Sequence, residues 1–255
     1  MLTQQRKNHI LEVLRRDGQV VAKQLSAELS LSEDTIRRDL RELSREGLLQ
    51  RVHGGALPSS PALADFSGRQ QVVPDEKTAI GRAAAALVQP GQIVFIDGGT
   101  TAVQMARHLA PNLRATVITH SPSVAVELVP HPAIEVVVIG GRLFKHSIVS
   151  VGSGTVEEIK RFRADCYFMG VTGIHPDAGL TTGDLEEANI KRAMMTAAAE
   201  TIVLASSEKL GRASAYAIAA VDDVSTLVVT DEVPSAALKP YRKRGITLIC
   251  AAMRK

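Results

Sequence analysis

One stretch of this 255-residue sequence has the residue types that could hold an anion. An apolar run ends at Asp97 and is followed by Gly98, Gly99, Thr100 and Thr101. The two glycines would let the backbone approach a ligand closely. The threonines would begin a helix, whose unpaired N–H groups and dipole favour negative charge. The stretch predicts a cradle for a phosphate or a carboxylate, or else an ordinary strand-to-helix turn with a threonine cap.

Other polar or glycine-rich pieces follow further apolar runs. They could line the same crevice if the runs form adjacent parallel strands, because such strands place ligands at their carboxyl ends. A lysine, a carboxylate and an anion cradle would suit a phosphorylated polyol. Taken singly, each charged side chain is more simply a solvated surface group. The candidate residues outside the cradle are His120, Gly140, Gly141, Glu187 and Lys209.

A second group of residues could contact DNA. Ile36, Leu40 and Leu43 form one apolar stripe of a helix predicted over residues 32–46. Arginines on the opposite face could bond guanine edges or clamp phosphates. The alternative is an ordinary surface helix whose charges pair three or four residues apart. The candidate DNA-contacting residues are Ser32, Glu33, Thr35, Arg37, Arg38 and Arg41 on the helix, and Arg51 and His53 on the chain that follows it.

The elements that must position the candidate DNA-contacting residues show the apolar spacing that is typical of helices. Helices are predicted over residues 4–16, 21–29 and 32–46, and a strand over 48–52 leads into a glycine turn. Three helices followed by a hairpin describe a winged helix-turn-helix, the small fold that docks a helix in the major groove of DNA. Residues 58–75 are rich in proline and serine at their start, which predicts a linker in the form of a loop or an extended arm.

From residue 77 onward helical stretches alternate with short apolar runs. This alternation predicts an α/β fold with a doubly wound, mostly parallel sheet. The chain therefore divides into a DNA-binding domain at 1–57, a linker at 58–75 and an effector-binding and oligomerisation domain at 76–255. The predicted strands are 93–97, 115–119, 135–139, 165–171, 201–205, 226–230 and 246–250, and the predicted helices are 101–109, 123–128, 154–161, 185–200 and 235–243.

Several motifs resemble one protein family. The run L-S-E-D-T-I-R-R-D-L at residues 31–40, followed by R-V-H-G-G-A at 51–56, resembles the DNA-binding signature of the DeoR family of bacterial transcription regulators. The D-G-G-T-T run at 97–101, E-A-N-I-K-R-A-M at 187–194 and K-L-G-R at 209–212 are similar to the family's sensor motifs. The family usually has Asn at the position of His120 and commonly has Asp at the position of Ser206. These two departures bear on which hydroxyl groups of the ligand the domain would recognise.

The resemblance implies a repressor of sugar or carbohydrate metabolism genes. Its second domain would resemble the ribose-5-phosphate isomerase fold and would sense a phosphorylated sugar or a related metabolite. We expect double-stranded operator DNA as a partner, and a homodimer or homotetramer, because a single winged helix covers one half-site. We expect no cofactor.

Two alternatives stay open at this point. An aldose–ketose isomerase would need a general base and a polarising group, roles that Asp97, Glu187 and Lys209 could fill. An isomerase has no need of a winged helix-turn-helix, so we do not favour catalysis and name no catalytic residue. A third possibility is a DNA-binding scaffold whose α/β domain only oligomerises.

Composition and the length of the apolar runs exclude several classes of protein. The chain is 45% hydrophobic and 22% charged, which excludes a wholly disordered protein. Its apolar runs are far shorter than the ~18 residues that span a bilayer, and its N-terminus does not have the pattern of a signal peptide. Two cysteines in apolar runs favour a reducing cytoplasm. The sequence has neither a C-x-x-C motif nor histidines at zinc spacing, so we predict no metal site.

Overall fold

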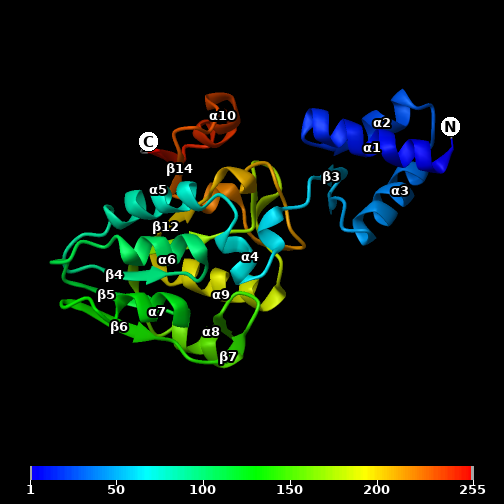
Figure 1. Ribbon diagram of the computed structural model, residues 1–255. Coiled ribbons are helices and arrows are strands. Elements are labelled where there is room, and N and C mark those ends of the chain that lie inside the picture. Colours follow the sequence, from blue (N-terminus) through cyan, green and yellow to red (C-terminus); the bar gives the residue numbers. More distant parts are fainter. Residues whose placement is uncertain (1, 254–255) are drawn as a thin grey trace.

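The computed structural model describes residues 2–253. It consists of a small N-terminal head of helices and a larger α/β domain, which are joined by the chain that follows the head (Figure 1). The fold class predicted from the sequence, a winged helix-turn-helix followed by a parallel-sheet α/β domain, is confirmed.

The head has three helices around a single apolar core. A three-stranded antiparallel sheet in the order β1-β3-β2 closes the core and forms the wing. Ile10, Leu14, Ile36 and Leu40 are all buried in this core. The elements are α1 (Thr3–Asp17), β1 (Val20–Val21), α2 (Ala22–Glu28), α3 (Glu33–Arg45), β2 (Gln50–Val52) and β3 (Gly55–Leu57).

Local chemistry explains where α3 begins. The Ser32 hydroxyl accepts a hydrogen bond from the Thr35 backbone N–H at 3.2 Å, which satisfies one of the free donors of the first turn. Acidic residues in that first turn complement the helix dipole. A buried ion pair then fixes α3 against α1, because Asp39 accepts hydrogen bonds from two nitrogens of the Arg6 guanidinium. Asp39 is therefore a structural residue of the head.

The α/β domain is built on a seven-stranded parallel sheet. Its order is β15-β14-β12-β9-β4-β5-β6, and every neighbouring pair is parallel. All seven predicted strands are confirmed. They are β4 (Ile93–Ile96), β5 (Ala115–Thr119), β6 (Ile134–Val138), β9 (Ala164–Gly170), β12 (Ala198–Leu204), β14 (Thr226–Thr230) and β15 (Thr247–Ala251).

The strand order reverses direction between two neighbouring strands, β4 and β9. From β4 the chain proceeds to β5 and β6 on one side of the sheet, and from β9 it proceeds to β12, β14 and β15 on the other. In open α/β sheets the crevice outside the carboxyl ends of two such strands is the usual place for a ligand.

Helices cover both faces of the sheet, as a parallel sheet requires. One apolar core lies between the sheet and α5 (Pro74–Ala85), α6 (Thr100–Arg107) and α7 (Pro122–Leu128). The second lies between the other face and α8 (Ser153–Ile159), α9 (Leu185–Thr196) and α10 (Ser235–Lys243). The helix predicted over 185–200 ends at Thr196, because residues 198–200 already belong to β12.

Two small antiparallel sheets were not predicted. One is the hairpin of β7 (Arg142–Phe144) and β8 (Val149–Val151). The other has the order β10-β11-β13, formed by β10 (Gly173–His175), β11 (Gly179–Thr182) and β13 (Tyr216–Ala219).

The segment between head and sheet is folded, which corrects the expectation of a loop or an extended arm. It contains a short 3-10 helix, η1 (Pro61–Leu63), and the helix α4 (Phe66–Gln70). The Asp65 carboxylate caps α4 by accepting the Gly68 N–H at 2.8 Å. The Phe66 ring is buried in the core under α5 and α6, and its N–H donates to the His146 carbonyl at 2.8 Å. An apolar anchor and a cap thus hold this segment to the α/β domain.

Candidate functional site

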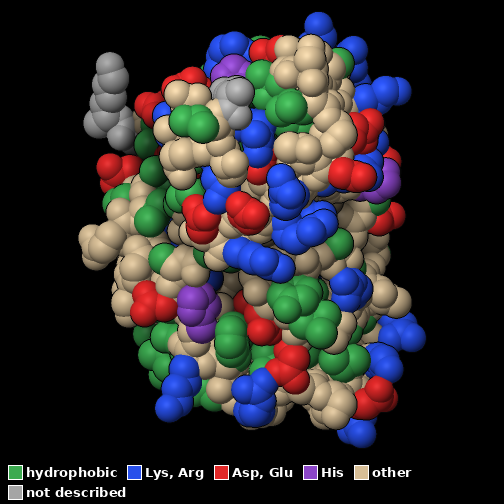
Figure 2. Space-filling view, turned by 90° about the vertical axis from the view of Figure 1, so that its right-hand side faces the viewer, with side chains coloured by type: hydrophobic (Ala, Val, Ile, Leu, Met, Phe, Trp, Pro, Cys, Tyr) green, Lys and Arg blue, Asp and Glu red, His purple; other side chains and the backbone are tan. Residues whose placement is uncertain are grey.

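The head presents arginines to solvent along one side of α3. Arg37, Arg38 and Arg41 are exposed, while the stripe on the opposite side of the helix is buried. In Figure 2, which views the molecule from the side of the head, Lys and Arg side chains gather in the upper middle of the face. Arg37 is paired with Glu33 at 2.7 Å. Arg38 and Arg41 make no ion pair with any of residues 2–253, so their guanidinium groups are free to meet an anion.

The other predicted DNA-contacting residues lie around this helix. The Ser32 hydroxyl is 2.9 Å from that of Thr35, so the two cap the start of α3 together. Arg51 on β2 and His53 in the following turn are exposed. The structure thus brings the predicted set to α3 and to the wing, and contact of each residue with DNA stays a prediction.

The predicted anion cradle lies at the switch between β4 and β9. Gly98 and Gly99 turn the chain, and Thr100 begins α6. A Cβ atom at Gly98 would lie 2.2 Å from the Val149 Cγ1, so the turn has room for glycine alone. Both glycines and both threonines line a cavity. The Thr101 hydroxyl is buried and has no hydrogen-bond partner in residues 2–253.

Asp97 lies beneath this cavity rather than in its lining. Its carboxylate is 1% exposed and accepts hydrogen bonds from the Gly98 and Gly170 N–H groups, each at 2.8 Å, and from the Lys191 Nζ at 2.5 Å. Burial works to raise the pKa of Asp97, but Lys191, His120 and the Gly170 N–H outweigh it and lower that pKa. Asp97 joins the ends of β4 and β9 and fixes Lys191.

His120, Gly140 and Gly141 do not line the cavity. His120 is buried beside Asp97, with 3.7 Å between its Nε2 and the Asp97 Oδ1, and burial lowers its pKa to about 4. It is therefore neutral at pH 7. The two glycines pack against the chain after β8, where the Gly140 carbonyl accepts a hydrogen bond from the Thr155 hydroxyl at 2.8 Å.

Four cationic side chains line the cavity: Arg69, Lys77, Lys191 and Lys209. They come from the consecutive helices α4 and α5, from α9, and from the 3-10 helix η2 (Ser207–Lys209), so the tertiary fold brings distant parts of the chain to one cavity. The cavity also includes two carboxylates, those of Glu187 and Glu208.

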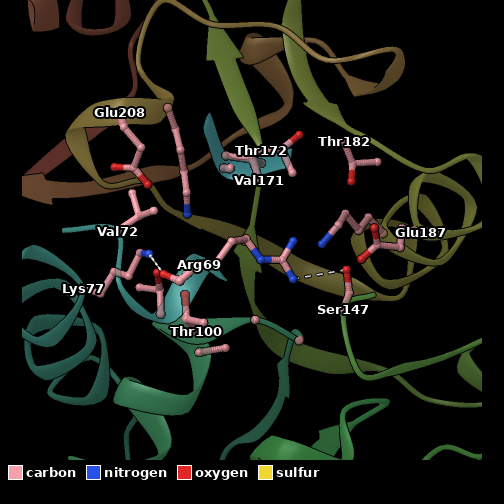
Figure 3. Close-up of a pocket in the computed structure, with 18 residues that line it drawn as sticks. Arg69, Val72, Lys77, Thr100, Ser147, Val171, Thr172, Thr182, Glu187 and Glu208 are labelled. Carbon is pink, nitrogen blue, oxygen red and sulfur yellow. Dashed lines mark hydrogen bonds between the residues drawn. The ribbon is translucent and has the colours of Figure 1, made fainter. Parts of the chain in front are cut away.

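The cationic side chains almost fill the space that they surround. Figure 3 shows Arg69 reaching across the cavity, where its Nη2 donates to the Ser147 hydroxyl at 3.2 Å. The Lys77 Nζ donates to the Arg69 carbonyl at 2.5 Å. The cavity volume is about 50 Å³. A sugar phosphate is larger than this space, so side chains around the cavity must rearrange to admit one.

Three of these cations lack an ion-pair partner in the described part of the chain, although Glu187 and Glu208 also line the cavity. Lys191 is paired with Asp97, but Arg69, Lys77 and Lys209 make no ion pair within residues 2–253. Burial lowers the pKa of all three side chains, that of Lys209 to about 8. Buried charge without a partner is costly. The cavity consequently favours an anion that would supply the missing charge.

Sequence reasoning missed part of this lining. Lys191 lies in one of the motifs but was not named as a site residue, and Arg69 was missed because its segment was taken for a linker. The other lining residues outside the predicted set include Lys77, Ser147, Thr172, Thr182 and Glu208. The buried Ser206, one of the two departures noted in the sequence, donates its hydroxyl to Glu208 at 2.8 Å. In the part of the chain that the structure describes, no group of three or more His, Cys, Asp or Glu side chains could hold a metal ion.

The chain joins a winged helix-turn-helix, which has a free basic face, to an α/β domain with a cationic cavity at its switch point. This combination defines a DNA-binding protein with a ligand-sensing domain. Two family models match the chain: the DeoR-like helix-turn-helix domain over residues 6–61 and the DeoR C terminal sensor domain over residues 73–232. The chain belongs to the DeoR family and is a DNA-binding transcriptional regulator. Of the helices between residues 2 and 253, none is both long and apolar enough to cross a membrane.

Relatives from bacteria and an archaeon are similar over nearly the whole chain. The HTH-type transcriptional repressor GlcR of Bacillus subtilis is 35% identical, covering 98% of this chain and 96% of its own. The HTH-type transcriptional regulator GlpR of Haloferax volcanii is 33% identical, with 98% of each chain covered. The glycerol-3-phosphate regulon repressor of Escherichia coli is 32% identical over 90% of this chain and 91% of its own. Among solved structures, ribose 5-phosphate isomerase A from Methanocaldococcus jannaschii has a TM-score of 0.40 at 19% identity, covering 53% of this chain and 54% of its own.

Proposed function

We propose that this regulator is a repressor of carbohydrate-metabolism genes whose affinity for operator DNA is set by a phosphorylated sugar or polyol. One observation carries the proposal: three cations that make no ion pair within residues 2–253, the partly buried Arg69 and the buried Lys77 and Lys209, line the cavity at the start of α6. A phosphate dianion would neutralise two of them and would bond the free N–H groups of the helix. The printed name of the glycerol-3-phosphate regulon repressor, one of the relatives, points to the same ligand chemistry.

The two sides of the cavity suit the two ends of such a ligand. Thr100, Thr101 and Lys209 would hold the phosphate at the cradle. Glu187 and Thr182 on the opposite side would accept or donate hydrogen bonds to hydroxyl groups, and the Thr182 hydroxyl has no other partner in residues 2–253. Glu187 and Lys209 thus keep the effector-binding roles expected from the sequence, whereas Asp97 acts through Lys191.

On the DNA side, Arg38 and Arg41 would enter the major groove with Arg37, and Arg51 and His53 would contact the adjacent backbone. Two heads in a homodimer or a larger homo-oligomer would read two half-sites. A ligand changes operator affinity only through a difference in free energy between two arrangements of these heads, and ~1–3 kcal/mol gives a change of ~5–150-fold.

We do not assign an isomerase activity. A general base must reach the proton that it removes. The Asp97 carboxylate is outside the cavity lining and its oxygens are occupied by Lys191 and two backbone N–H groups. Incubation of the protein with pentose and hexose phosphates should leave each sugar phosphate unchanged, as measured by anion-exchange chromatography.

The test of the proposed function is operator binding followed by fluorescence polarisation. The full chain is titrated onto labelled DNA from upstream of its own gene, at several salt concentrations, with each sugar phosphate paired with its unphosphorylated parent. We expect tight binding that weakens steeply with salt, and a shift of ~5–150-fold by at least one phosphorylated compound but by none of the parents. The proposal fails if no upstream fragment binds at low salt, or if parent and phosphate act alike.

A further inference from the structure

We propose that Arg69 couples the effector cavity to the DNA-binding head, because it binds the anionic group of the effector while belonging to the segment that carries the head. This inference rests on the proposed function. It assigns to the segment 58–73, which spans the gap between the two family models at residues 62–72, the role of responding to whether the cavity holds a ligand.

The segment 58–73 is attached at one end to the head and along its length to the walls of the cavity. The Ser59 hydroxyl donates to the Gly47 carbonyl of the head at 3.1 Å, while the Ser59 backbone pairs with Ala213 of the α/β domain. The Ser60 hydroxyl donates to the Thr172 carbonyl, and Thr172 itself lines the cavity. A change in how the segment is held therefore changes how the head is held.

Arg69 has unused binding capacity where the anion would lie. Its side chain lies across the cavity in Figure 3, and its one side-chain hydrogen bond within residues 2–253 is the 3.2 Å contact with the Ser147 hydroxyl. A guanidinium has five N–H donors in a planar fork that matches a phosphate. Burial lowers the pKa of Arg69 even though Glu187, Asp65 and Asp97 act in the opposite direction, so its charge is poorly compensated.

Lys77 places a second cation at the same junction. Its Nζ donates to the Arg69 carbonyl at 2.5 Å, and it lines the cavity from the first turns of α5. An anion between Arg69, Lys77 and Lys209 would consequently bridge the segment to the α/β domain. These bonds form only when the anion is bound and the segment 58–73 is packed against the α/β domain. The anion therefore shifts the population of molecules toward the form in which this segment is packed.

The experiment uses the full chain and inorganic phosphate as the probe. Calorimetry measures phosphate binding, and hydrogen–deuterium exchange measures the amides of residues 58–73 with and without saturating phosphate. Arg69→Gln removes the guanidinium, Arg69→Lys keeps the charge without the fork, and Arg82→Gln removes a cation of the neighbouring α5 that does not line the cavity.

We expect phosphate to slow exchange in residues 58–73 by at least about fivefold in the wild type and in Arg82→Gln. Arg69→Gln should still bind phosphate through Lys209 and the cradle, about tenfold more weakly, but saturating phosphate should leave its exchange unchanged. Arg69→Lys should give an intermediate slowing, and it keeps the test decisive if Arg69→Gln does not fold.

The outcomes separate this inference from the proposed function. If wild-type protein binds no phosphate, the anion site is wrong and the coupling role of Arg69 is overturned with it. If both wild type and Arg69→Gln bind phosphate and both show the same slowing in residues 58–73, the anion site stands and the role given to Arg69 alone is overturned.

Discussion

Lys191 and Lys209 line the same cavity, but their carboxylate neighbours differ. Lys191 lies 2.5 Å from Asp97, whereas Lys209 makes no ion pair with any residue in the described range 2–253. Removal of one member of a buried pair leaves an uncompensated charge, while removal of an unpaired charge relieves the protein of a cost. The two lysines should therefore respond to substitution in opposite ways.

Lys191→Met should destabilise the folded protein by about 3–5 kcal/mol, because it leaves the Asp97 carboxylate buried without its cation. The free energy of unfolding is measured by urea denaturation. Lys160→Met is the matched control, since Lys160 pairs with Glu157 at the surface, where such pairs contribute little. A loss no larger than that of the control would show that Asp97 does not depend on Lys191.

The lowered pKa of Lys209 predicts that the affinity for phosphate depends on pH. Burial lowers its pKa to about 8 in the unliganded protein. If its protonated form holds the phosphate, the affinity for inorganic phosphate should fall as the pH rises above about 8, by up to about tenfold per pH unit. Calorimetry between pH 7 and pH 9.5 measures this, and the decline should vanish in Lys209→Gln.

Stability should show the opposite trend from the same group. Between the folded pKa near 8 and the ordinary lysine value of 10.5, the unfolded chain binds more protons at residue 209 than the folded one. The contribution of Lys209 to stability therefore rises with pH across this window. Urea denaturation of wild type against Lys209→Gln isolates it, and a contribution that falls with pH would contradict the assigned burial.

At the scale of elements, the turn from β4 to α6 is fixed by its contact with the β7–β8 hairpin. The backbone at Gly98 approaches Val149 of β8 so closely that a Cβ has no room. The turn of the hairpin contains Ser147, whose hydroxyl accepts the hydrogen bond of Arg69. The two elements together set the width of the cavity.

Gly98→Ala should destabilise the protein by about 1–3 kcal/mol and weaken phosphate binding, because the new methyl group forces the turn away from Val149. Adding Val149→Ala should restore part of both losses, which a double-mutant cycle measures. Gly154→Ala serves as the control, since a Cβ there meets nothing within 4 Å. Equal losses with and without the Val149 change would rule out this contact as the cause.

Much of the fold was predictable because apolar runs of strand length are strong signals. All seven strands of the large sheet were predicted, and so was the glycine turn between β4 and α6, whose residues line the cavity. The small sheet β10-β11-β13 was missed, because its short strands depend on pairing between distant residues. Arg69 and Lys77 also needed the tertiary structure. The packing of Phe66 brings α4 over the cavity, and the packing of α5 on the sheet places Lys77 there. The burial of His120 also needed the tertiary structure.

At the scale of the whole molecule, we expect DNA affinity to depend on the exposed side of α3, whose side chains do not belong to the core of the head. Arg38 is exposed and makes no ion pair with residues 2–253, so its loss should not disturb the head.

Arg38→Ala should weaken operator binding by about 1–3 kcal/mol, a factor of about 5–150, with the thermal midpoint unchanged. Polarisation assays with operator and unrelated DNA at several salt concentrations measure this. Loss on both DNAs with a shallower salt slope indicates a phosphate contact, and loss on the operator alone indicates a base contact. Arg45→Ala, at the far end of α3, should change neither; unaltered operator affinity in Arg38→Ala would remove that residue from the interface.

Arg69 precedes the sheet and yet lines the cavity. The cavity therefore includes a residue that lies before residue 73, where the match to the sensor-domain model begins. A chimaera that takes its head from a relative and is spliced directly after Leu57 would keep the ligand site complete. A splice at residue 73 would replace α4, which carries Arg69, with the corresponding segment of the relative. If the proposed site is right, exchange of heads among such regulators preserves effector recognition only when the crossover falls upstream of α4.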